Sequence, residues 1–320
     1  MQLPILLQQS IENITAFCSL KKLSDASLQL TDRYRNPVKE GKYVNNDMDY
    51  LAYIVARMPA TYAVIFRVLQ ELMHRFPAWA PSSCLDLGSG PGTGLWAAIE
   101  NFPSMHDLYA WEFDSAFIQL GQELARSHNT LSRISWSHKD YTQDRNYPSV
   151  DLGILSYSVG EIPEERFSDF FKNIWQKINH SLVIIEPGTP AGYHRILKIR
   201  ELLLKENANL IAPCPHHLSC PLLKEDWCHF YARLERSSIH RKIKHASLNY
   251  EDEKFSYLIF SKEKNTSLYS GRILRFPNIQ KGFVQISVCS QEGVLQNKTI
   301  SKKNKDDFKS IKKKDWGDSI

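Results

Sequence analysis

The spacing of hydrophobic positions changes along the chain, and these changes mark the elements that the sequence predicts. Over the first 76 residues the apolar side chains recur three and four positions apart, which is the period of an α-helix with one buried face. We therefore expect a helical N-terminal region over residues 1–76. Its clearest stretch contains Tyr62, Ile65, Phe66, Leu69, Leu72 and Met73.

Short apolar runs alternate with helical stretches in the central part of the chain. The runs have the length of buried strands, and their alternation with helices predicts a parallel β-sheet covered by helices. The sequence thus predicts an α/β core over residues 77–264. The expected strands are 83–87, 108–112, 134–137, 151–156 and 182–186, followed by two last strands at 209–212 and 255–260.

Beyond residue 264 the pattern becomes the alternation of polar and apolar residues that is typical of a half-buried strand. This alternation covers residues 283–288 and returns over 294–300, which predicts a small β extension over residues 265–300. Residues 301–320 form a lysine-rich tail, and we expect disorder there.

One expected strand, 83–87, leads into a glycine-rich turn and then a helix. Gly88, Gly90 and Gly92 let the backbone turn sharply and approach a ligand closely, and the helix that follows directs its first N–H groups at that ligand. The dinucleotide pattern G-x-G-x-x-G needs a glycine where Thr93 stands. The loop therefore favours S-adenosylmethionine over NAD as cofactor.

Acidic residues occur where the cofactor would need them. Glu112 ends the second apolar run, at the offset of a ribose-binding acid, and Asp140 closes the third, where an adenine-binding acid would lie. Asp86 begins the glycine loop, and Tyr157, after the fourth strand, would face the methyl donor. In this arrangement the segment resembles the core of the class I methyltransferases, which predicts a Rossmann-like α/β fold that binds S-adenosylmethionine.

Composition limits the class of protein without choosing a function. The chain has 320 residues, of which 42% are apolar and 23% charged, as in ordinary globular proteins. No apolar run is long enough to span a bilayer, and the N-terminus lacks the features of a cleavable leader. We expect a soluble monomer in the bacterial cytoplasm, with no membrane partner. The net charge of +5 is concentrated in lysines near the end, which suggests an acidic partner such as RNA.

The six cysteines favour metal binding or plain burial over a disulfide framework, because the chain is long and shows no secretory leader. Cys214, Cys220 and Cys228 lie within an insertion over residues 213–236 that is rich in His and Pro. Zinc would take these three thiolates and one histidine, whereas an iron–sulfur cluster would normally take four thiolates. The spacing does not decide between them. The candidate histidines are His216, His217 and His229.

Seven segments spread over almost the whole chain resemble the Rsm-twenty-two family, methyltransferase-like assembly factors of the small ribosomal subunit in mitochondria and bacteria. The cysteine segment is the most specific part of the resemblance. The segments are 57–62 (RMPATY), 86–94 (DLGSGPGTG), 160–163 (GEIP), 186–189 (EPGT), 212–216 (APCPH), 226–230 (DWCHF) and 250–257 (YEDEKFSY).

The resemblance implies a [4Fe-4S] cluster held by the three cysteines of the insertion and by Cys289 from the C-terminal extension. It also implies action on small-subunit rRNA, either as a methyltransferase or as an rRNA-binding assembly factor in which cofactor and cluster are structural. The segment after the fourth expected strand lacks the acceptor motifs of amino and cytosine C5 methyltransferases, so the sequence names no catalytic residue.

Overall fold

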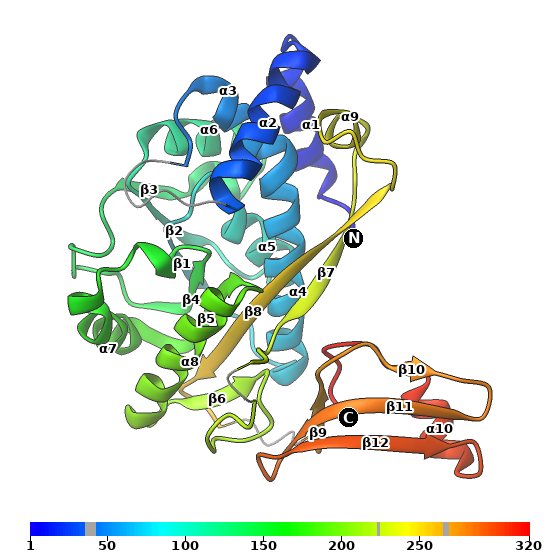
Figure 1. The fold of residues 1–320 in the computed structure, drawn as a ribbon. Helices are drawn as coiled ribbons and strands as arrows, with labels where there is room; N and C mark the ends of the chain where they lie inside the picture. Colours follow the sequence, from blue (N-terminus) through cyan, green and yellow to red (C-terminus); the bar gives the residue numbers. More distant parts are fainter. Residues whose placement is uncertain (36–42, 223–224, 265–268) are drawn as a thin grey trace. The chain divides into compact units, whose positions relative to one another are not determined.

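The structure is a computed structural model that describes residues 1–35, 43–222, 225–264 and 269–320 (Figure 1). The chain forms two compact units, and each is assembled from segments that are distant in sequence. The first unit comprises Met1–Arg67, Ser82–Tyr141 and Ala232–Glu253. The second comprises Val68–Pro81, Thr142–Tyr231 and Lys254–Ile320.

Parallel strands form the sheet of the first unit, in the order β3-β2-β1. In register, Leu87 lies beside Trp111, and every residue of β1 is buried, including the polar Ser83 and Asp86, as is typical of a strand in a parallel sheet. Helices connect the strands, as expected from the sequence. The elements are β1 (Ser83–Leu87), α5 (Thr93–Asn101), β2 (Asp107–Glu112), α6 (Ser115–Ala125), η2 (Leu131–Arg133) and β3 (Ser135–His138).

The N-terminal region is helical, as the 3.6-residue period predicts. Asn46 caps one helix by accepting a hydrogen bond from the backbone N–H of Asp49 at 3.1 Å. The run Asp47–Arg75 is long and apolar enough to cross a membrane, yet 72% of its apolar window is buried inside the protein, as in a core helix. The elements are α1 (Ile5–Thr15), α2 (Leu20–Arg35), α3 (Asp47–Ala52), the π-helical turn η1 (Tyr53–Arg57) and α4 (Met58–Arg75). A later segment adds α9 (Ser238–Ile243) to the first unit.

The second unit carries the strand order β4-β5-β8-β6. Strands β4 and β5 are parallel, whereas β8 is antiparallel to both of its neighbours, which corrects the expectation of a wholly parallel sheet. The elements are β4 (Val150–Ser156), η3 (Val159–Glu161), η4 (Glu164–Arg166), α7 (Phe167–Lys177), β5 (Ile178–Pro187), α8 (Pro190–Lys205), β6 (Asn209–Ala212), β7 (Phe230–Glu235) and β8 (Tyr250–Ser261).

Helix α8 begins with a capped first turn. The Thr189 hydroxyl accepts a hydrogen bond from the backbone N–H of Gly192 at 3.2 Å, and Pro190 opens the first turn. Gly192 is needed there, because a Cβ at this position would lie 2.1 Å from the carbonyl oxygen of Pro187. The helix is thereby packed tightly against the end of β5.

A second, four-stranded sheet forms the C-terminal part of the second unit. Its strands are β9 (Gly271–Ile273), β10 (Asn278–Ile279), β11 (Phe283–Ser290) and β12 (Leu295–Ser301), followed by α10 (Lys305–Ile311). The expectation of a disordered tail is wrong. Ile311 packs into the apolar core of this sheet, Trp316 is buried, and the N–H of Ile320 donates to the carbonyl of Gly271 at 3.0 Å.

The fold class predicted from the sequence is confirmed. Parallel strands joined by helices, with one antiparallel strand in the second unit, are the elements of a Rossmann-like class I methyltransferase fold. The insertion contains a strand that the sequence analysis missed, β7, which pairs with β8. The start of the expected β extension, residues 265–268, lies outside the described residues.

Candidate functional site

The glycine loop after β1 has the left-handed backbone that only glycine adopts without strain. Gly88, Gly90 and Gly92 have φ angles of 67°, 53° and 81°. Glu112, at the end of β2, accepts a hydrogen bond from the backbone N–H of Gly90 at 2.7 Å and another from that of Asp114 at 2.9 Å. The first unit thus brings the predicted ribose acid to the predicted cofactor loop, where it fixes the loop backbone.

Asp86 lies beneath this loop and is fully buried. Burial raises its pKa to about 7, with a further contribution from the charge of Glu112, while the N–H of Gly94 opposes the shift. That N–H does not reach the geometry of a full hydrogen bond to either carboxylate oxygen within the described residues. A Cβ at Gly94 would lie 2.4 Å from Oδ2 of Asp86, so the carboxyl group and the start of α5 are in close contact.

Two tyrosines of the N-terminal helices border the loop, and the sequence analysis did not find them. The hydroxyl of Tyr50 donates to Asp114 at 2.7 Å, and the hydroxyl of Tyr53 would lie 3.9 Å from a Cβ at Gly90. Burial raises the pKa of both. A tyrosine on an apolar helix face looks like a core residue in the sequence, so no pattern distinguishes it.

The other two predicted cofactor residues are less informative. Asp140 is half-buried and follows β3, beside Lys139, whose N–H donates to the carbonyl of Glu112 at 3.0 Å. Tyr157 follows β4 in the second unit with a φ of 60°, a left-handed conformation that is strained for a tyrosine. Its role toward a methyl donor stays a prediction.

A buried carboxylate ends β5 in the second unit. Glu186 is 1% exposed and accepts a hydrogen bond from Nε of Arg195 at 2.6 Å. Burial raises the pKa of this carboxyl group, and the charge of Arg195 opposes the rise. A Cβ at Gly160 would contact the same guanidinium at 3.5 Å. The pair therefore joins the start of α8 to the turn after β4.

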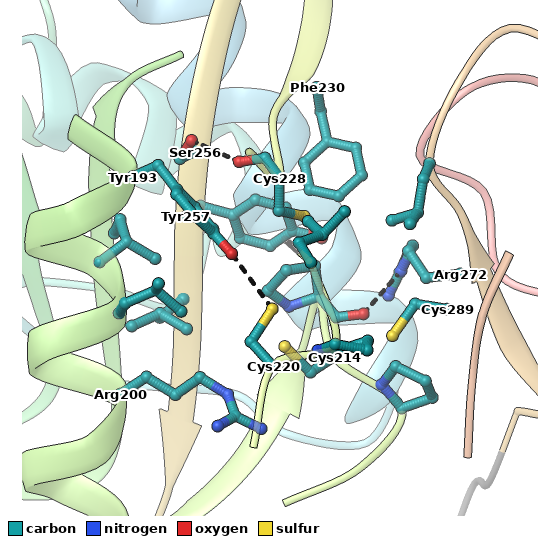
Figure 2. A pocket seen from close by; sticks show the side chains of 18 residues that line it. Tyr193, Arg200, Cys214, Cys220, Cys228, Phe230, Ser256, Tyr257, Arg272 and Cys289 are labelled. Carbon is teal, nitrogen blue, oxygen red and sulfur yellow. Dashed lines mark hydrogen bonds between the residues drawn. The ribbon is translucent and has the colours of Figure 1, made fainter. Parts of the chain in front are cut away.

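Cys214, Cys220, Cys228 and Cys289 line one pocket of the second unit, which we call the thiol pocket (Figure 2). The first three come from the insertion, and Cys289 comes from β11 of the C-terminal sheet. The structure thus brings together all four predicted ligands, although about sixty residues separate the third from the fourth.

Hydrogen bonds from the core hold the insertion in place around the thiol pocket. The indole N–H of Trp227 donates to the carbonyl of Gly188 at 2.9 Å, and the hydroxyl of Ser256 donates to the backbone carbonyl of Cys228 at 2.7 Å. From the C-terminal sheet, Nε of Arg272 donates to the carbonyl of Pro213 at 2.9 Å. The backbone beside two of the cysteines is therefore fixed by residues outside the insertion.

Two polar side chains reach the sulfur atoms themselves. The hydroxyl of Tyr193 lies 3.1 Å from Sγ of Cys220 (Figure 2). Nε2 of His216 lies 3.3 Å from Sγ of Cys289. Burial raises the pKa of Cys289 to about 12, with contributions from the charges of Cys214 and Cys220. The charges of Arg200 and Arg272 oppose this rise, and metal binding would have to displace the proton of the Cys289 thiol.

The donor set has the chemistry of a thiolate metal centre. Burial raises the pKa values of Cys214, Cys228 and Cys289, and the charges of neighbouring cysteines add to each rise. In the described ranges, however, no three His, Cys, Asp or Glu side chains are close enough to hold a single metal ion. One zinc ion needs all four ligands about 2.0–2.3 Å away. A four-iron cluster instead spreads four thiolates over four irons.

The chain is 25% identical over 288 residues to the human "Ribosome assembly protein METTL17, mitochondrial", covering 84% of this chain and 62% of that protein. It is 23% identical over 401 residues to "Ribosome assembly protein RSM22, mitochondrial" of Saccharomyces cerevisiae, covering 80% and 64%. The chain therefore spans less than two thirds of the length of these relatives.

Among solved structures, magnesium protoporphyrin IX methyltransferase (ChlM) from Synechocystis PCC 6803 with bound SAM matches with a TM-score of 0.41 at 15% identity, over 73% of this chain and 91% of that one. A family model described as "Mitochondrial small ribosomal subunit Rsm22" matches residues 47–320. Because that match covers most of the sequence, the chain belongs to the Rsm22 family, as the sequence resemblance predicted.

Proposed function

We propose that this protein binds S-adenosylmethionine and a [4Fe-4S] cluster and acts on small-subunit rRNA during ribosome assembly. Family membership supports the ribosomal part, since two relatives are named ribosome assembly proteins. The observation that carries the proposal is the thiol pocket, in which cysteines of the insertion and of β11 meet.

The glycine loop is the donor site of this proposal. The left-handed backbone of Gly88, Gly90 and Gly92 would let the loop approach the cofactor closely. Glu112 would meet the ribose hydroxyls, and Asp140 would lie near the adenine. In this structure the Glu112 carboxylate already accepts two backbone N–H groups, so ribose binding would add to those bonds or replace one of them. Methyl transfer needs mainly an acceptor held in line with the sulfonium carbon.

The metal centre has a structural role in this proposal. Cys214, Cys220, Cys228 and Cys289 would hold the cluster and so fasten the C-terminal sheet to the core. Binding energy that is available only in the folded, metal-bound state appears directly as stability. The insertion and β11 would then be ordered together, and chelation would loosen both.

Lysines of β12, α10 and the segments next to them supply the rRNA-binding surface of this proposal. Most are exposed, and phosphate groups are the partners that such a cluster of ammonium groups favours. Asp306 and Asp307, in the first turn of α10, interrupt the positive charge. The lysines are Lys298, Lys302, Lys303, Lys305, Lys309, Lys312, Lys313 and Lys314.

The second candidate is an assembly factor without methyltransferase activity. It is favoured by the segment after β4, which lacks a known acceptor motif. The cytoplasmic location and the monomeric state expected from the sequence remain proposals.

Mapping of rRNA methylation separates the two candidates. A deletion strain would be complemented with the wild type, with Glu112→Ala, or with Asp107→Ala as a control on the exposed end of β2. If the protein is a methyltransferase, a methyl group of the small-subunit rRNA should be missing in the deletion strain and in the Glu112→Ala strain. It should be present in the Asp107→Ala strain. If all strains carry the same methyl groups while the deletion strain accumulates immature subunits, the protein acts without catalysis.

A further inference from the structure

Arg200 is a buried cation without an anionic partner. It lies on α8, is 3% exposed, and lines the thiol pocket (Figure 2). One terminal nitrogen donates to the carbonyls of His216 at 3.0 Å and Leu218 at 2.6 Å. Within the described residues its Nε has no hydrogen-bond partner.

Such a charge strongly destabilises a folded protein unless an anion compensates it, because carbonyl dipoles replace only part of the lost hydration. The described lining of the thiol pocket contains no Asp or Glu. The groups there that can become negative are the cysteines, and a cysteine becomes a thiolate when it binds a metal.

The other arginine of the pocket is already satisfied. Arg272 donates to Glu71 at 2.7 Å, to the carbonyl of Gly317 at 2.7 Å and to that of Pro213 at 2.9 Å. Glu71 also accepts from Arg75 at 2.7 Å, so both arginines face this carboxylate. Arg200 is therefore the cation of the pocket whose charge is left for a bound group.

We propose that Arg200 is the counter-charge of the metal centre and stabilises the negative charge that this centre carries. This inference rests on the proposed function, because it assumes that the four cysteines bind a metal. Four thiolates around a doubly positive core leave a net charge of minus two. Arg200 offsets one of these two charges. One-electron reduction of a cluster adds a further negative charge, which Arg200 stabilises more strongly than the oxidised form.

The test compares anaerobically purified full-length proteins. Arg200→Met removes the charge at similar length, and Arg200→Lys keeps it. Lys198→Met is the matched control, because it removes a cation from a partly exposed position of the same helix. The midpoint potential is measured by reductive titration followed by electron paramagnetic resonance, and metal release by a colorimetric chelator.

We expect Arg200→Met to shift the midpoint potential by about 59 mV or more to the negative, which is a tenfold change in the ratio of reduced to oxidised cluster. Chelator release should accelerate roughly tenfold or more. Arg200→Lys should recover most of the potential, which a purely structural role would not predict, and Lys198→Met should match the wild type. A wild-type potential and release rate in Arg200→Met would overturn the inference.

Failure of the proposed function has a different signature. Zinc without iron in the wild-type protein would refute the cluster, and the release rate of zinc would then decide the role of Arg200 by the same comparison. No bound metal in the wild type would refute both.

Discussion

Replacing Asp86 with Asn should change how stability depends on pH. Asp86 is fully buried under the glycine loop, and its pKa rises from 3.8 to about 7 because burial and then the charge of Glu112 disfavour the ionised form. Asparagine has nearly the same shape as the protonated acid. The substitution therefore removes the ionisation while leaving the packing against Gly94 in place.

The size of the effect follows from the shift in pKa. Between pH 4 and 7 the folded protein keeps a proton on Asp86 that the unfolded chain has lost, so stability falls as pH rises through this window. A shift of about three pKa units corresponds to about 4 kcal/mol. Asp86→Asn should thus raise the free energy of unfolding at pH 8 by up to about 4 kcal/mol and leave it nearly unchanged at pH 4.

Urea unfolding followed by circular dichroism between pH 4 and 8 measures this difference. Asp107→Asn is the control, because it makes the same chemical change on an exposed residue of the same unit and should follow the wild-type curve. If Asp86→Asn is no more stable than the wild type at pH 8, the carboxyl group is not held in an unfavourable charged state and the reasoning fails.

Three further predictions concern the donor loop, the lysines and a buried ion pair. Calorimetry should show that the wild type binds S-adenosylmethionine and that Glu112→Ala binds it more weakly, because the Gly90 N–H loses its acceptor; equal binding would refute the donor site. Replacing five exposed lysines with glutamine should flatten the salt dependence of rRNA affinity. The slope of log K against the logarithm of the salt concentration should become shallower by about 0.7 for each phosphate contact that is lost. An unchanged slope would move the RNA site elsewhere. Arg272→Met should lower the free energy of unfolding by about 3–5 kcal/mol, because it leaves Glu71 beside one cation instead of two; denaturant melts showing under 1 kcal/mol would contradict this. The five lysines are Lys302, Lys303, Lys309, Lys312 and Lys313.

Much of the α/β framework was predictable because its strands are buried on both faces and read as apolar runs. The expected limits 83–87 and 209–212 match β1 and β6. Strand β7 was missed because its short alternation follows directly after the cysteine segment. The order of the C-terminal tail was missed because it depends on pairing with β9, which lies about fifty residues earlier in the chain.

Some residues of the candidate sites can be recognised in the sequence, and others cannot. The glycine loop and the cysteines are recognisable because each type of residue is rare and its chemistry specific. Arg200 and Tyr193 are not recognisable, because an arginine or tyrosine on an amphipathic helix usually marks the edge of its buried face. Their role comes from residues 214–220 folding back onto α8, and only the tertiary structure contains that information.

Iron and acid-labile sulfide in anaerobically purified protein test the central claim, that the insertion and the C-terminal sheet share a metal centre. The account predicts about four irons and four sulfides per chain in the wild type, and the same in Cys18→Ser, whose cysteine lies outside the thiol pocket. Cys289→Ser should lose most of the iron and make residues 271–320 sensitive to protease. Full iron content in Cys289→Ser, or zinc in place of iron in the wild type, would contradict it.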